Sequence, residues 1–195
     1  MSFTISELLQ QLANGLTLGS LYALVAIGYT MVYGILRLIN FAHGDIFMMS
    51  MYFAFYAISV FYLPWYIAVV LVILATGLLG VIIERCAYKP LREAPRISLM
   101  ISSIGVSYLL ENLAIVLFTG IQKNFPSIPL FQDIITIGSI RMQRLTILVP
   151  IITAVIAVVL LYLINHTKTG LAMRAASKDL EAAKLMGINI NRTIA

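Results

Sequence analysis

Long uncharged apolar runs alternate with short polar segments along the chain. Residues 8–36 and 46–83 contain no charged side chain, and residues 145–165 form a third such run. A helix needs about 20 apolar residues to cross a bilayer core of about 30 Å, so each run can supply a membrane span. The runs are continuously apolar, which excludes barrel strands, because barrel strands alternate apolar and polar residues.

The run 46–83 is too long for one span. A single helix of its 38 residues would measure about 57 Å. The sequence Leu63-Pro64-Trp65-Tyr66 lies in its middle, where Pro breaks a helix and Trp and Tyr favour the lipid–water boundary. A further apolar segment is interrupted by Glu111-Asn112. The predicted spans are 11–33, 45–63, 66–84, 97–118 and 145–165.

Composition supports a membrane protein over a soluble one. The 195 residues are 61% hydrophobic and 11% charged, with a mean hydropathy of +0.99. Soluble domains carry roughly 25% charged residues, so the apolar side chains must face a lipid bilayer. We therefore predict an all-α polytopic transmembrane helix bundle that forms one domain over residues 1–195. The single cysteine, Cys86, excludes an internal disulfide or a multi-cysteine metal site.

Basic residues predict the orientation, since they are enriched in cytoplasmic loops. With five alternating spans, ten basic residues fall on one side and three on the other. The N-terminus is then outside, and the tail 166–195 is cytoplasmic. No basic residue precedes Arg37, so the first apolar segment lacks the positive start of a signal peptide and is expected to be a permanent span. The net charge of +5 thus indicates topology and lipid contact, with no nucleic-acid partner.

Two polar clusters lie near or within the spans. Asn40, His43 and Asp45 belong to one cluster, which is either a structural turn at the cytoplasmic face or a polar element lining a translocation path. A lone His with one Asp offers too few ligands for a metal. Glu111-Asn112 lies inside a span, where an ionisable residue faces the bundle interior or a wet cavity, unless it is paired or reaches the outer interface.

Small residues at helical spacing, Gly15, Gly19, Ala23 and Ala26, predict close packing of the first span against another helix.

The polar tail predicts a short cytoplasmic helix over about 178–186. Ser177 is a good N-cap, acidic residues follow it, Lys184 suits the C-terminus, and Gly187 is a natural helix stop. Its Ala-rich surface would let a partner protein dock closely. The pattern is equally consistent with an amphipathic helix resting on the membrane.

The tail sequence Glu181-Ala182-Ala183, followed by Gly187, resembles the EAA-x-x-x-G signature of bacterial ABC-importer permeases. Four further segments at compatible spacing resemble the permeases for branched-chain amino acids, and in particular the H-type subunits of the high-affinity importers. These segments are 40–45, 84–92, 104–112 and, around the signature itself, 169–175 with 185–189. In this family the EAA segment is a coupling helix that sits in a groove of a cytoplasmic ATPase.

The resemblance implies a multi-pass permease subunit of an ATP-driven importer of Leu, Ile or Val in the bacterial inner membrane. It also implies three kinds of partner: cytoplasmic ATPase subunits that bind the ATP, a second permease subunit, and a periplasmic binding protein. No Walker motif G-x-x-x-x-G-K-[ST] occurs, so we expect no catalytic residue, metal or cofactor in this chain.

Two sets of residues follow from this interpretation. Those expected to contact the ATPase are Arg174, Asp179, Glu181, Ala182, Ala183 and Gly187. The candidates for the translocation path are Asn40, His43, Asp45, Glu111 and Asn112.

Three alternatives remain at the level of sequence. Permeases for urea and short amides share the architecture. A secondary transporter driven by an ion gradient would need intramembrane acids in paired repeats, and only Glu111 qualifies. A membrane scaffold without transport is disfavoured by the coupling-type tail. Family permeases continue with further spans, whereas this sequence ends at Ala195, so we expect it to be incomplete.

Overall fold

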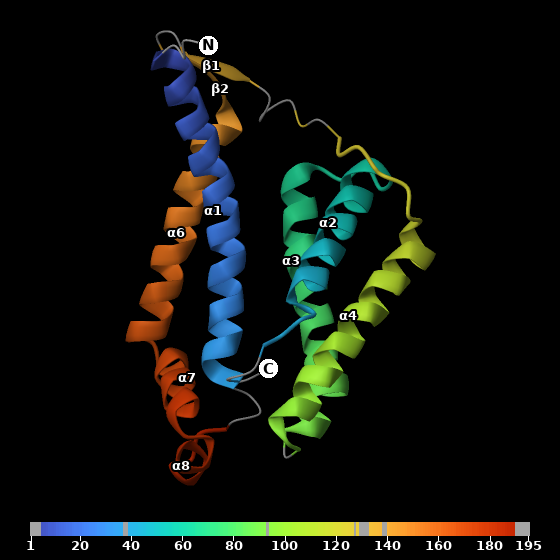
Figure 1. Ribbon diagram of the computed structural model, residues 1–195, viewed down its shortest axis with the longest axis vertical. Helices are drawn as coiled ribbons and strands as arrows, with labels where there is room; N and C mark the ends of the chain where they lie inside the picture. Colours follow the sequence, from blue (N-terminus) through green and yellow to red (C-terminus); the bar gives the residue numbers. More distant parts are fainter. Residues whose placement is uncertain are drawn as a thin grey trace. The chain divides into compact units, whose positions relative to one another are not determined.

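The computed structural model describes residues 5–36, 39–92, 94–126, 128, 133–137 and 140–189, and these are mostly helical (Figure 1). The chain contacts divide into two compact units. One unit contains α1, two short strands, α6, α7 and α8, and the other contains α2, α3 and α4. The predicted all-α class is confirmed, with one small hairpin added.

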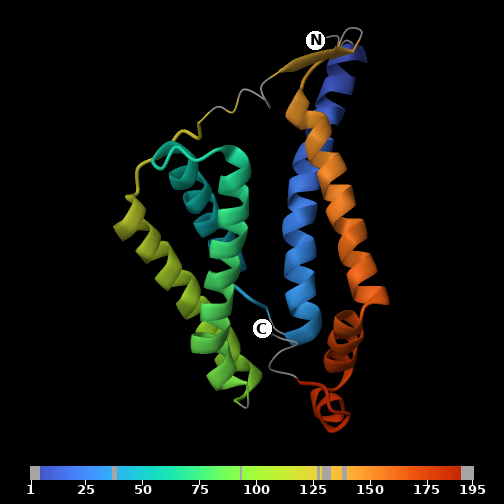
Figure 2. The same cartoon turned by 180° about the vertical axis from the view of Figure 1, so that it is seen from behind.

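In the first unit, α1 (Ile5–Leu36) and α6 (Arg144–His166) lie side by side and run in the same direction (Figures 1 and 2). The Thr17 hydroxyl donates to the Thr146 carbonyl at 2.9 Å. Deeper along the pair, the buried Thr153 hydroxyl lies 3.5 Å from the Ser20 carbonyl. Two polar contacts thus join the two helices.

The contact between Thr17 and Thr146 has a local cause in α6. Pro150 lies inside this helix and has no N–H to donate to the carbonyl four residues earlier, which belongs to Thr146. In lipid a freed carbonyl needs another donor, and a hydroxyl from a neighbouring helix can supply it. The Thr17 hydroxyl of α1 is in place to do so, although its single proton is shared with the Ala13 carbonyl of its own helix, 3.0 Å away.

A β-hairpin, which the sequence analysis did not predict, precedes α6. Strand β1 (Ile134–Ile137) pairs antiparallel with β2 (Ile140–Gln143), with Ile134 opposite Gln143. Asp133 and Arg144 close its open end through an ion pair of 2.9 Å between Oδ2 and Nη2. The sequence signal was two tetrads, Ile-Ile-Thr-Ile and Ile-Arg-Met-Gln, separated by two residues within a segment interpreted only as polar.

In the second unit, α2 (His43–Ser59) and α3 (Trp65–Ile83) run antiparallel and are joined by a tight turn (Figure 1). Pro64 is the N-cap of α3, so the predicted break at 63–66 is confirmed. After α3 the chain forms a π-helical turn, η1 (Glu84–Tyr88), and a 3-10 turn, η2 (Lys89–Leu91). Helix α4 (Arg96–Phe118) follows. Met49, Ile83 and Leu110 belong to the shared core of this unit.

Four described segments are long and apolar enough to cross a membrane: Glu7–Gly34, Trp65–Leu91, Ile97–Phe118 and Arg144–His166. Most of their apolar side chains are exposed on the isolated chain, as lipid contact requires. The second predicted span, 45–63, ends earlier than predicted, at Ser59. With 17 residues α2 measures about 26 Å, slightly less than the bilayer core of about 30 Å.

Glycine packing in α1 differs from the prediction. A Cβ added at Gly15 or Gly19 would meet no heavy atom within 4 Å. No described helix therefore approaches α1 closely at these two positions, and the small-residue surface stays open within the chain.

The tail forms two helices, α7 (Lys168–Lys178) and α8 (Leu180–Leu185), where one helix over 178–186 was predicted. The predicted N-cap, Ser177, is wrong: Ser177 lies in the last turn of α7, and its hydroxyl donates to the Arg174 carbonyl at 2.8 Å. Asp179 is the residue that separates the two helices and caps α8. Gly187 is the predicted helix stop, and its φ of +82° confirms that role.

Candidate functional site

The tail is attached to the membrane helix α6 by a close elbow. Thr167 is extended between α6 and α7, and its hydroxyl oxygen accepts a hydrogen bond from the Gly170 N–H at 3.1 Å. A Cβ at Gly170 would lie 2.3 Å from the carbonyl oxygens of both Leu163 and Ile164. These are backbone atoms that cannot swing aside, so the geometry of the elbow requires glycine.

Helix α8 is short and therefore depends on its caps. At its start, Asp179 Oδ1 accepts hydrogen bonds from the N–H groups of Glu181 at 2.9 Å and Ala182 at 3.1 Å. At its end, the Gly187 N–H donates to the Lys184 carbonyl at 3.1 Å. A six-residue helix is marginal alone, and these bonds fix where it begins and ends.

The end of α8 presents an apolar surface. The Leu185 side chain is 88% exposed and the Met186 side chain is 83% exposed, next to the exposed residues Glu181 and Ala182. By contrast, Ala183 is only 4% exposed. We call Glu181, Ala182, Leu185 and Met186 the tip surface. The sequence pattern already made Ala182, Leu185 and Met186 apolar residues of the predicted tail helix, and the structure shows that all three are exposed.

The six predicted coupling residues therefore have different surroundings. Arg174, on the exposed side of α7, donates from Nη2 to the Asn165 carbonyl at 3.3 Å and so ties α7 back to α6. Asp179 is engaged in the cap of α8, and Ala183 is buried. Glu181 and Ala182 have exposed side chains that serve neither of these roles, and the exposed Gly187 ends α8.

Among the path candidates, Asn40 is an internal structural residue. It is 7% exposed, and its Oδ1 accepts hydrogen bonds from the Tyr88 hydroxyl at 2.7 Å and from the Ala42 N–H at 3.2 Å. The neighbouring Phe41 N–H lies 3.4 Å from the hydroxyl of Ser103, a fully buried side chain of α4. These bonds hold the turn before α2 against η1 and α4.

Asp45 and His43 lie one turn further on, at the start of α2. Asp45 is half-buried, and its carboxylate accepts a hydrogen bond from the Ser107 hydroxyl of α4. His43 is also half-buried. The cluster predicted from 40–45 is thus the N-terminal end of a helix packed on α4, with its polar atoms directed to partners that the sequence analysis had not paired with it.

An ion pair that the sequence analysis missed lies at the base of the same unit. Glu84 Oε1 of η1 pairs with Arg92 Nη2, and the two side chains are only 11% and 17% exposed. The sequence analysis placed both residues in the segment 84–92 that carries the family resemblance, and it counted Arg92 among the basic loop residues, but it did not pair the two. In a continuous α-helix, residues eight apart are separated by about 12 Å along the axis. The irregular turns η1 and η2 instead bring the two side chains together.

Glu111 and Asn112 are exposed on α4. The Asn112 Nδ2 donates to the Tyr108 carbonyl of its own helix at 2.7 Å. Glu111 lies one turn beyond Ser107, the partner of Asp45, so a polar stripe continues along α4 from the buried cluster to this carboxylate. A carboxylate exposed on a helix of this apolarity requires water or a further protein chain beside it.

The comparisons with known proteins agree with this architecture. A family model described as the permease component of the branched-chain amino acid transport system matches residues 11–195. The high-affinity branched-chain amino acid transport permease protein BraD of Pseudomonas aeruginosa is 39% identical over 98% of this chain and 66% of its own length. The corresponding permease proteins LivH of Salmonella typhimurium and Escherichia coli are 37% identical over 100% of this chain and 67% of their own lengths.

The chain spans about two thirds of the length of these curated relatives. No solved structure matches it.

Proposed function

The chain belongs to the branched-chain amino acid transport system permease family, and we propose that it forms part of the membrane path of an ATP-driven importer of leucine, isoleucine and valine. It is a multi-pass membrane protein, and the proposed location is the bacterial inner membrane. The names of its relatives support the cargo. The proposed partners are a cytoplasmic ATPase pair that binds the ATP, a second permease subunit and a periplasmic binding protein.

The tip surface of α8 is the observation that carries the proposal. Exposed Leu185 and Met186 stand at the end of a polar tail, where nothing in the described chain covers them. Beside them, the small side chain of Ala182 allows a close approach, and Glu181 adds a charge. An apolar patch rimmed by polar residues is typical of a protein interface. We assign it to the ATPase, with Arg174, Asp179 and Ala183 shaping the tail behind it.

Coupling then follows from the elbow at Gly170. Movement of the ATPase pair would push α8 and α7, and α7 abuts the last turn of α6 at backbone contact distance. Since the elbow has no room to compress, the push would move α6 as a rigid body. Small displacements are amplified in this way because packed elements switch between discrete arrangements.

For the cargo path we propose the side of α4 that carries Glu111 and Asn112. A branched-chain amino acid needs polar groups for its charged ends and apolar walls for its side chain. The exposed carboxylate of Glu111 and the amide of Asn112 would provide the polar part, within a cavity completed by the second permease subunit. Asn40 and Asp45 would act indirectly by fixing α2 on α4, and half-buried His43 remains a path candidate.

The test is capture of the separate ATPase by the detergent-solubilised permease. Met186→Glu places a charge on the tip surface without touching a buried atom, so we expect the captured ATPase to fall about tenfold. Leu171→Glu is the matched control, because Leu171 is 60% exposed on α7 and undergoes the same chemical change away from the tip. Ala183→Glu is less informative, because Ala183 is buried and its replacement would unseat α8.

Two further measurements separate the alternatives. Uptake that continues after ATP is depleted while the ion gradient is kept would contradict the ATP-driven mechanism. Cargo is identified by the solute that co-purifies with the cognate binding protein, where urea or a short amide in place of leucine would overturn the proposed substrate. Equal capture of the ATPase by both glutamate variants would refute the tip surface as its docking site.

A further inference from the structure

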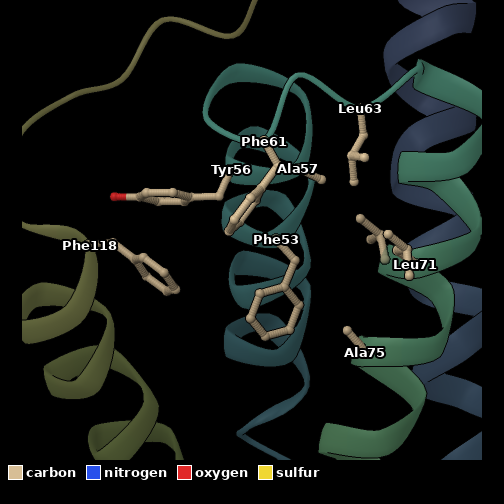
Figure 3. A pocket seen from close by; sticks show the side chains of 9 residues that line it. Phe53, Tyr56, Ala57, Phe61, Leu63, Leu71, Ala75 and Phe118 are labelled. Atoms are coloured by element: carbon tan, nitrogen blue, oxygen red, sulfur yellow. The ribbon is translucent and has the colours of Figure 1, made fainter.

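An apolar pocket lies between α2, the turn that follows it, α3 and the last residue of α4 (Figure 3). Its volume is about 370 Å³, within the usual range of about 300–1,000 Å³ for ligand pockets. Phe53, Ala57, Phe61, Leu71, Ala75 and Phe118 are among the side chains that line it. Eight of the nine lining side chains are purely hydrocarbon, and Tyr56 is the exception.

A cation stands at the Tyr56 side of this pocket. The Lys123 ammonium donates to the Tyr56 hydroxyl at 2.6 Å and lies 4.6 Å from the centre of the Tyr56 ring. Figure 3 shows the Tyr56 hydroxyl pointing away from the pocket, so the charge lies outside the apolar space. The Tyr56 ring packs on Phe118, with 5.1 Å between centroids, and connects the charge to the apolar wall.

This arrangement selects for an amphiphile with a hydrocarbon chain and an anionic head. A free amino acid would also place a carboxylate on Lys123, but its ammonium group would need an acceptor, and no acidic side chain lines the pocket. A phospholipid makes no such demand, because its phosphate carries the negative charge next to its acyl chains. Trp65 and Tyr66, of the kind that mark lipid–water boundaries, begin α3 beside the turn.

We propose that this pocket holds an acyl chain of an anionic phospholipid whose phosphate contacts Lys123. The site is independent of the proposed transport function, because it uses neither the tip surface nor the polar stripe on α4. Occupation would fill the space between α2, α3 and the end of α4, and would hold the short helix α2 at its place in the bilayer.

The experiment measures lipid retention by native mass spectrometry of the full chain in detergent, with phosphatidylglycerol as the probe. Ala75→Trp fills the pocket, and we expect retained lipid to fall about tenfold. Leu78→Trp is the matched control, because Leu78 is on the same helix, is 62% exposed and does not line the pocket. Lys123→Gln should lower retention of phosphatidylglycerol, whereas Lys89→Gln, on η2, should not.

Helical content by circular dichroism checks that the variants fold. Should Ala75→Trp lose helical signal, Ala75→Leu takes its place, and a smaller loss of bound lipid still supports the site. Equal retention by Ala75→Trp and Leu78→Trp, or by the two glutamine variants, overturns the proposal. Binding of radiolabelled leucine by the wild type but not by Ala75→Trp would also overturn the proposal, because the pocket would then be an amino-acid site.

Discussion

Asn40 illustrates how a polar residue near a membrane span can be structural. An amide in a motif beside a span suggests contact with cargo, yet its oxygen accepts hydrogen bonds from Tyr88 and Ala42 and its side chain is buried. Sequence reasoning could identify Asn40 as notable but could not name its partner, which lies 48 positions away. The pairing of Asp45 with Ser107 spans 62 positions and was equally out of reach.

We predict that Asn40→Ala destabilises the chain, because it leaves the buried Tyr88 hydroxyl and the Ala42 N–H without their acceptor. An unsatisfied buried donor costs about 1–3 kcal/mol. Thermal unfolding in detergent measures the loss. Asn112→Ala is the control, since that amide is exposed and bonds only to its own helix, and its variant should unfold close to the wild type. A similar loss in both variants would contradict the structural role of Asn40.

At the scale of whole elements, the sequence predicted where the helices lie but was less accurate about where each helix begins and ends. Long apolar runs and Pro64 placed the spans, because lipid forces such runs into helices. The hairpin β1–β2 was missed because its tetrads lie in a polar region, where no long apolar pattern marks an element. One tail helix was predicted because Ser177 suits an N-cap, whereas in the structure Asp179 has that role and Ser177 lies inside α7.

Thr17 should be important for the pairing of α1 with α6. Thr17→Val removes the hydroxyl that satisfies the Thr146 carbonyl, which Pro150 leaves open, so we expect a loss of about 1–3 kcal/mol in unfolding free energy. Thr17→Ser keeps the donor and should retain most of the stability. The added variant Pro150→Ala restores the donor within α6, so Thr17→Val should cost less in that background. An equal cost in both backgrounds would refute the compensation.

The elbow at Gly170 gives a prediction that separates coupling from binding. Gly170→Ala forces a methyl group against two backbone carbonyl oxygens, so α7 must shift relative to α6. We expect ATP-driven uptake by the assembled importer to fall about tenfold while the ATPase is still captured. Gly44→Ala is the control, because a Cβ there meets nothing within 4 Å. Unchanged uptake with Gly170→Ala would show that the elbow does not transmit movement.

For the whole molecule, helix direction agrees with the charge distribution. Helices α1 and α6 of one compact unit run the same way, which is the relation that the five alternating predicted spans give to the first and the fifth (Figure 2). The count of basic residues favours this alternation mainly through the loop 85–96 and the tail 166–195, which together carry nine of the 13 basic residues. It could not predict the division into two compact units, which depends on side-chain contacts between distant segments.

Cys86 allows the orientation to be tested with one reagent. It is exposed in η1, beyond the end of α3 that we expect on the cytoplasmic side. A membrane-impermeant maleimide should label it only after cells are permeabilised. Tyr66→Cys in a Cys86→Ser background moves the thiol to the other end of α3, at a position that is 57% exposed, and should react in intact cells. The reverse labelling pattern would invert the topology.

The proline in α6 has a consequence for biosynthesis. Thr17 is inserted into the membrane 129 positions ahead of Thr146, and until the two helices meet, the freed carbonyl faces hydrocarbon with no donor of its own. It is therefore unfavourable for α6 to leave the translocon unpaired, and pairing with α1 removes this cost. The pairing of α6 with the earlier-inserted helix α1 therefore satisfies this carbonyl as soon as the two helices meet.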